Sequence, residues 1–81
     1  MPNGLIYICD DMRHLVCLPY SVENLHTMSS DLGIDRCWLH SGKYPHYDIP
    51  KRRIKEIQDK CHKIVSAKVV FKIVRGDVTS L

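Results

Sequence analysis

The sequence contains no hydrophobic run that approaches the roughly 20 residues needed to span a membrane as a helix. Its opening residues, Met-Pro-Asn-Gly, also lack the charged region and the apolar stretch of a secretion signal. We therefore expect a cytoplasmic protein that has no membrane partner.

Several motifs that carry well-known chemistry are missing. There is no glycine-rich phosphate loop, no nucleophile elbow and no His-Glu-x-x-His sequence. The cysteines are few and widely spaced, and none forms the Cys-x-x-Cys pair of a zinc ribbon. In a reducing compartment structural disulfides are rare. Cys9, Cys17 and Cys37 adjoin apolar residues, and Cys61 continues the apolar helical stripe of Ile54 and Ile57. We therefore interpret all four cysteines as buried thiols in preference to zinc ligands.

Length and charge set further bounds. The 81 residues predict a single compact α/β domain over 1–81, and so short a chain buries a limited core, so we expect a homo-oligomer. The net charge is only +3, but Lys and Arg are concentrated in residues 43–63. This segment is either a solvated helix face or a surface that attracts phosphate.

Hydrophobic periodicity predicts the first half of the fold. Leu5 to Cys9 is apolar on both faces, which favours a buried central strand, and residues 15–18 suit an edge strand before Pro19. Ser21 is typical of a helix N-cap. A helical stripe of apolar residues follows it and ends at Gly33, a favoured C-terminal cap.

The second half of the chain also alternates between predicted strands and helices. Residues 36–40 predict a strand, with Trp38 in the core, and 41–47 a loop. Asp48 is expected to cap a second helix that has Pro50 in its first turn. Ile64-Val65 predicts a short strand, and 67–74 favours a helix over a strand. The fold class expected is α/β, with a small, three- to four-stranded, mostly parallel sheet flanked by two or three helices.

Polar residues follow the predicted strands. Asp10 and Asp11 end the first strand, and His40 ends the third. The loop after His40 leads to His46-Tyr47-Asp48. Because ligands of open α/β sheets bind at the carboxyl ends of the strands, we expect these side chains to converge at one edge.

These residues also carry a family resemblance. The chain combines Tyr7-x-x-Asp10-Asp11, Trp38-x-His40 and His46-Tyr47-Asp48-x-Pro50, with arginine shortly after. In this it resembles a short phage and bacterial family catalogued as domain of unknown function 4031, over about residues 7–75. Members often have tryptophan where this chain has His14. The resemblance implies a phage or bacterial cytoplasmic setting and a mixed α/β fold, but no reaction.

Two kinds of chemistry suit the polar cluster. With a divalent metal as cofactor, carboxylates and imidazoles would activate water on a phosphoester, the catalytic set being Asp10, Asp11, His40, His46 and Asp48. A ligand that carries phosphate would instead contact Asp11, Arg13, His40, His46, Tyr47, Asp48, Arg52 and Arg53, beside Lys51. A simpler structural interpretation has one of the paired aspartates cap the following turn and the other pair with an arginine. The remaining histidines, His14, His26 and His62, are interpreted as surface or internally bonded residues.

Three functions follow. We favour a non-catalytic binding module for a phosphate-bearing partner, such as a nucleotide or nucleic acid, because a chain of this size leaves little room for both a core and a closed active site. A metal-dependent phosphoesterase or nuclease is the alternative. A third interpretation is a protein-interaction module that inhibits a host protein through its basic second helix.

Overall fold

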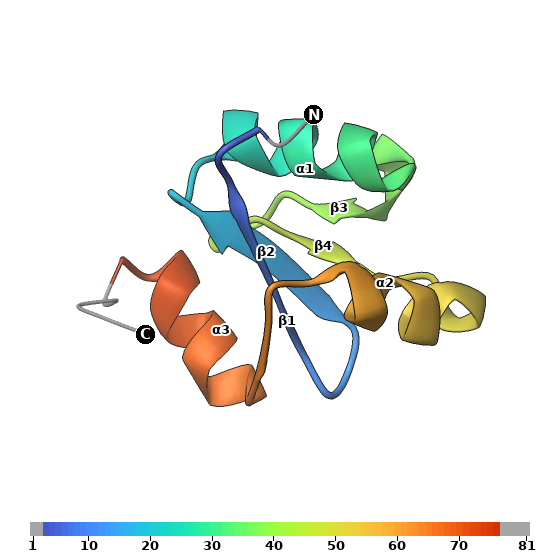
Figure 1. The fold of residues 1–81 in the computed structure, drawn as a ribbon. Coiled ribbons are helices and arrows are strands. Elements are labelled where there is room, and N and C mark those ends of the chain that lie inside the picture. The colour runs from blue at the N-terminus through green and yellow to red at the C-terminus, as the bar shows by residue number, and fades with distance from the viewer. Residues whose placement is uncertain (1–2, 77–81) are drawn as a thin grey trace.

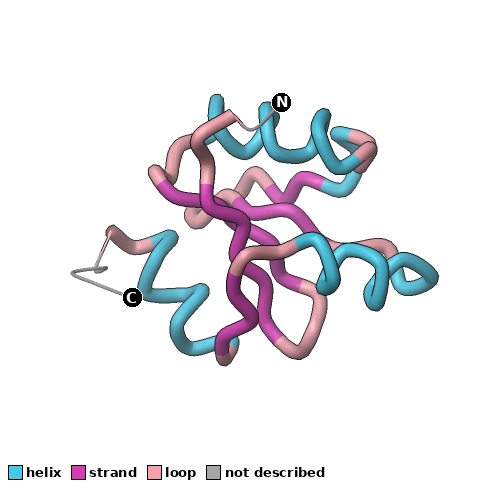
Figure 2. The backbone as a smooth tube through the Cα atoms, in the orientation of Figure 1, coloured by secondary structure: helices cyan, strands magenta, loops and turns pink. Residues whose placement is uncertain are grey.

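The computed structural model describes residues 3–76, which form one five-stranded sheet with helices on both faces (Figures 1 and 2). The strands lie in the order β3-β4-β2-β1-β5. Their bounds are β1 (Ile6–Asp10), β2 (His14–Leu18), β3 (Leu39–His40), β4 (His46–Asp48) and β5 (Lys63–Val65).

The α/β class is confirmed, but the expectation of three to four mostly parallel strands is wrong. Only β1 and β5 pair in parallel, while β1–β2, β2–β4 and β3–β4 are antiparallel. The reason is the length of the connections. Residues 11–13 join β1 to β2 and 41–45 join β3 to β4, and a parallel crossover needs a dozen residues or more. The two longer connections contain the helices: residues 19–38 join β2 to β3, and residues 49–62, which contain α2 (Ile54–Lys60), join β4 to β5.

Helix α1 (Val22–Leu32) matches its prediction at both ends. The Ser21 hydroxyl accepts a hydrogen bond from the Asn24 backbone N–H at 3.0 Å. Gly33 ends the helix at φ 69°, a left-handed conformation that glycine adopts without a Cβ clash. The helical alternative for the last segment is also confirmed, since α3 (Ala67–Val74) buries Val70 and Ile73.

Three local predictions are wrong. Strand β2 is central and not an edge, because it pairs with both β1 and β4. Residues 36–40 form a 3-10 turn, η1 (Arg36–Trp38), followed by the short β3. Asp48 ends strand β4 and caps no helix, and a second 3-10 turn, η2 (Lys51–Arg53), leads into α2.

Alternation along the strands gives the sheet two different faces. Leu15 of β2 lies opposite Tyr47 of β4, and the Tyr47 hydroxyl accepts a hydrogen bond from Ser29 of α1, so α1 covers this face. Helix α3 packs on β1 and β2 from the other face. Figure 1 shows α1 and α2 on one side of the sheet and α3 on the other.

The cysteines divide by position. Cys9 and Cys17 are fully buried in the sheet, and burial raises the pKa of the Cys17 thiol to about 11. Cys61 is half-buried. Cys37 is exposed, which corrects the expectation of a buried thiol there, because it lies in η1 and not in a strand. No helix within residues 3–76 is long and apolar enough to cross a membrane.

Arg53 joins the C-terminus of α1 to α2, and we expect its removal to destabilise the fold. Its guanidinium donates to the carbonyls of Leu32 and Gly33, each at 2.8 Å, and to the Glu56 carboxylate. Arg53→Ala should lower the free energy of unfolding by about 1–2 kcal/mol through the lost carbonyl contacts. Arg52→Ala is the matched control, since Arg52 is exposed. It should change the free energy of unfolding by less than about 0.5 kcal/mol.

Urea denaturation at several pH values checks this prediction. The hydrogen bond from Arg53 holds the pKa of the Glu56 carboxyl at about 2, below its ordinary value of 4.5. The stability that the pair contributes is therefore present above pH 4.5 and is lost as the pH falls towards 2. The difference between wild type and Arg53→Ala should shrink over that interval, and equal effects of both substitutions would contradict the assigned role.

Candidate functional site

Four polar side chains from three adjacent strands meet on the sheet face that carries α3. In the register of the sheet, His14 of β2 lies opposite Asp48 of β4, and His46 of β4 lies opposite His40 of β3. His46 and Asp48 are two residues apart on one strand and so point to the same face. Between them Tyr47 points the other way, into the core. The alternation of residues 46–48 thus separates a buried face from a polar one.

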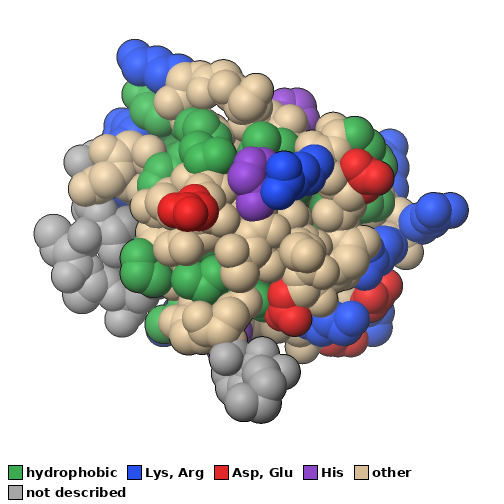
Figure 3. Space-filling view, turned by 90° about the horizontal axis from the view of Figure 1, so that it is seen from above, with side chains coloured by type: hydrophobic (Ala, Val, Ile, Leu, Met, Phe, Trp, Pro, Cys, Tyr) green, Lys and Arg blue, Asp and Glu red, His purple; other side chains and the backbone are tan. Residues whose placement is uncertain are grey.

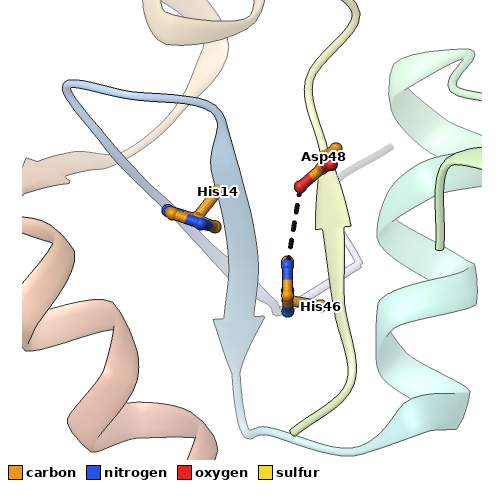
Figure 4. Close-up of side chains that lie close together, drawn as sticks. All are labelled: His14, His46 and Asp48. Carbon is orange, nitrogen blue, oxygen red and sulfur yellow. Dashed lines mark ion pairs between the residues drawn. The ribbon is translucent and has the colours of Figure 1, made fainter. Parts of the chain in front are cut away.

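The side chains of this cluster are in close contact. His40 Nε2 lies 2.6 Å from Asp48 Oδ2, and His46 Nε2 lies 3.5 Å from Asp48 Oδ1. The rings of His40 and His46 stack with centroids 5.1 Å apart, and the His14 ring meets His46 edge-on at 5.2 Å. One ligand atom each from His14, His46 and Asp48 lies within 4.8 Å of the others (Figure 4).

In His14 and in His46, the ring nitrogen Nδ1 lies next to a hydrogen-bond acceptor. His14 Nδ1 lies 2.5 Å from Oδ2 of Asp10, a carboxylate that is fully buried. His46 Nδ1 lies 3.0 Å from the carbonyl oxygen of Tyr44. A carbonyl only accepts, so His46 carries its proton on Nδ1, and the Asp10 carboxylate favours the same tautomer for His14. In both rings Nε2 is then the nitrogen left to bind a ligand.

Two imidazole nitrogens and one carboxylate are a suitable ligand set for a metal ion. Zinc in catalytic sites takes three protein ligands and keeps a further position for water or substrate, and iron is bound by the same kind of set. Metal-bound histidines commonly donate their other N–H to a carboxylate or a backbone carbonyl. Within residues 3–76 this is the one group of three or more His, Cys, Asp or Glu side chains whose ligand atoms gather in this way.

The predicted site residues are therefore only partly brought together. His40, His46 and Asp48 belong to the cluster, but not at the end of a parallel sheet. Asp10 is fully buried and reaches the cluster only through its bond to the His14 ring. Asp11 is exposed in the turn after β1. Tyr47 is fully buried, with its hydroxyl 2.8 Å from His26 Nδ1, and so presents no ring face to a ligand.

The predicted arginines lie away from the cluster. Arg13 Nε donates to the carbonyl of Ile49 at 2.9 Å, and its guanidinium lies 6.0 Å from the centre of the Trp38 ring. Trp38 packs against the hydrophobic core, as expected, but is only partly buried. Arg53 is held by α1 and Glu56, as described above. Together with the exposed Lys51 and Arg52, it lines a separate hollow of about 460 Å³ beside Trp38.

Positive charge is also dispersed over the surface. On the face seen in Figure 3, Lys and Arg side chains are scattered, some near the centre beside a histidine and others beside Asp or Glu. Within residues 43–63, Lys60 pairs with Glu56 at 3.2 Å and Lys55 with Asp59 at 3.9 Å. The excess of basic residues in 43–63 is therefore partly neutralised by acidic neighbours.

His14 is the cluster member that the sequence analysis leaves out, because it is interpreted there as a surface or internally bonded residue. The bond between His14 and Asp10 agrees with the second of these alternatives. The available signal was the spacing Asp10-x-x-x-His14. With a tight turn between two strands, this spacing places the carboxylate and the imidazole side by side on neighbouring strands. The Tyr44 carbonyl was missed as well, and no side-chain pattern could have indicated it.

Comparison with known proteins gives one match. No curated protein and no solved structure matches the chain. A family model, described as "Protein of unknown function (DUF4031)", matches residues 7–76, which is most of the chain and agrees with the resemblance of its motifs. The protein therefore belongs to this family.

Proposed function

We propose that the protein is a divalent-metal-dependent phosphoesterase whose metal ligands are His14, His46 and Asp48. The observation that carries this proposal is the orientation of the two histidines. Each has its Nδ1 occupied by a buried or backbone acceptor, which leaves Nε2 for a metal. His14 stands where members of the family often have tryptophan, so the centre is proposed for this chain and not for the family.

The chemistry follows from three protein ligands. A divalent metal held by these residues would bind the phosphoryl group and supply hydroxide as the nucleophile near neutral pH. Hydrolysis would form a bond from that oxygen to phosphorus and break the bond between phosphorus and the ester oxygen. The products would be phosphate and an alcohol, whose oxygen would receive a proton.

His40 is placed to supply that proton. Its side chain is 59% exposed, and its Nε2 lies 2.6 Å from the oxygen of Asp48 that is farther from His46. A histidine in such a position exchanges protons with solvent and is held at the centre by the carboxylate. We assign to it the role of general acid towards the leaving alcohol.

A specific observation also supports the non-catalytic binding module. The hollow beside Trp38 combines an aromatic ring with the side chains of Lys51 and Arg52, and such a combination suits a phosphate-bearing aromatic ligand. This hollow contains none of the four cluster residues, so the two functions make separate predictions.

The metal centre predicts stoichiometric binding. The wild-type protein should bind one Zn²⁺ or Mn²⁺ per chain, measured by native mass spectrometry and by titration calorimetry. His46→Asn should weaken the affinity at least a hundredfold, because it removes one of three ligands. His62→Asn is the matched control, because His62 lies away from the cluster and accepts a hydrogen bond from the Tyr7 backbone. Equal affinities of the two variants would contradict the assignment.

Asp10 should act on metal affinity without touching the metal. Asp10→Asn keeps the size of the side chain and an oxygen for the Met12 and His14 N–H groups, but weakens its hold on the His14 ring. We expect a ten- to hundredfold loss of metal affinity, the range found for such supporting residues. The exposed neighbour provides the control Asp11→Asn, which should bind metal like wild type. Thermal melts of both variants would exclude unfolding as the cause.

Phosphoesterase activity should require the metal. With p-nitrophenyl phosphate as the probe, we expect turnover by the metal-loaded protein, loss of activity on chelation, and recovery when metal is added back. Asp48→Asn should lower kcat at least a hundredfold, whereas Asp59→Asn, at an exposed ion pair, should not. Turnover that survives chelation would refute the proposal. Metal-free binding of the probe that is lost in Arg52→Ala, without turnover, would favour the binding module.

A further inference from the structure

An apolar pocket of about 320 Å³ adjoins the candidate metal centre. Two of the proposed metal ligands, His14 and His46, form one wall of it. The other walls are Tyr44 and a stripe of α3, made of Ala67, Val70, Phe71 and Val74. If these histidines hold a metal ion, a substrate group bound to that ion would therefore lie next to an apolar surface.

The apolar stripe on α3 extends beyond the part of the helix that packs against the sheet. The pocket-lining residues of α3 have the spacing i, i+3, i+4 and i+7, which places them on one side of the helix. Val70 is almost fully buried against the sheet, but Phe71 is 45% exposed. The Phe71 ring meets Tyr44 edge-on with centroids 5.2 Å apart. These two aromatic rings extend the apolar wall outwards from the histidines.

The lining favours an apolar ligand group. Apart from the two histidines, the described residues that line the pocket include no charged side chain. The basic and aromatic hollow lined by Lys51 and Arg52 is a different feature, with no residue in common with this pocket. Two cations, Lys43 and Arg75, lie over the rings of Tyr44 and Phe71 but are not among the lining residues. Within the pocket, an alkyl or aryl group would leave water for an apolar surface.

We infer that this pocket binds the alcohol part of the substrate, and that the substrate is a phosphate ester of an apolar alkyl or aryl alcohol. This inference rests on the proposed phosphoesterase function, because the metal centre is what would hold the phosphoryl group at the mouth of the pocket. The volume is at the lower end of the range for small-molecule sites, about 300–1,000 Å³, and suits one short chain or ring.

Two phosphonates that cannot be hydrolysed test this inference. Methylphosphonate and hexylphosphonate have the same head group and differ by five methylenes. Each methylene that is buried should strengthen binding roughly fourfold. Titration calorimetry of the zinc-loaded protein should therefore show hexylphosphonate binding at least tenfold more tightly than methylphosphonate.

Filling the pocket should remove this difference. Ala67→Leu places a larger side chain at the start of α3, and should reduce the preference for the hexyl chain to less than about twofold without weakening methylphosphonate or zinc. Lys68→Leu is the matched control, since Lys68 is exposed on the same helix and does not line the pocket. Phe71→Ser is a second variant, which opens the wall at a partly exposed position and should lower the preference as well.

The outcomes separate the two proposals. Equal affinity of the zinc-loaded protein for both phosphonates would overturn the substrate class while the metal centre stands. A preference that survives in Ala67→Leu, or that is lost in Lys68→Leu, would overturn the placement of the alcohol in this pocket. Failure to retain zinc, or to bind either phosphonate when zinc is bound, would overturn the phosphoesterase itself, and the substrate class with it.

Discussion

The buried carboxylate of Asp10 is the constraint on which the site depends. It has no exposure to solvent, and an unpaired charge in that position would cost several kcal/mol. The structure satisfies it locally, since Asp10 accepts from the backbone N–H groups of Met12 and His14 and bonds the His14 ring. These bonds close the turn between β1 and β2. The same interaction therefore fixes the antiparallel hairpin and the orientation of a proposed metal ligand.

The antiparallel hairpin also determines which side chains lie next to one another on the sheet. Because β2 returns beside β1, it becomes the central strand, and His14 lies opposite Asp48. One face of β2 and β4 is covered by α1, and the buried polar atoms there are paired, as in the bonds between Tyr47, His26 and Ser29. On the other face α3 packs on β1 and β2, and the polar ends of β3 and β4 lie beside it. A polar cluster next to an apolar wall results from this arrangement.

Local signals predicted the helices well and the sheet poorly. Ser21 and Gly33 mark α1 because caps act within one turn of the chain, and α3 follows from the helical spacing of its apolar residues. Strand pairing depends on contacts between distant segments, and β3 and β4 have only two and three residues. The stretch His46-Tyr47-Asp48-Ile49 does alternate polar and apolar residues, a strand pattern that the neighbouring Gly42 and Pro45 obscured. The prediction of a parallel sheet failed because no local signal distinguishes a tight hairpin from a strand end at Asp10-Asp11.

The site shows what composition can and cannot predict. Asp10, His40, His46 and Asp48 were expected to meet because polar residues follow apolar strands. His40, His46 and Asp48 do meet, although on neighbouring antiparallel strands and not at a parallel edge, whereas Asp10 bonds only the His14 ring of the cluster. His14 was missed because its role depends on a register that only the folded sheet defines. The arginines were expected at the site because of their charge, yet Arg53 donates to carbonyls at the end of α1. A guanidinium that binds the free carbonyls of a helix stabilises the fold. Some basic side chains of residues 43–63 therefore have a structural role, as Arg53 does, and others, such as Lys51 and Arg52, line the hollow beside Trp38. The chemistry of the candidate site therefore depends on its histidines and carboxylates, whose partners are fixed, and not on the net charge of the chain.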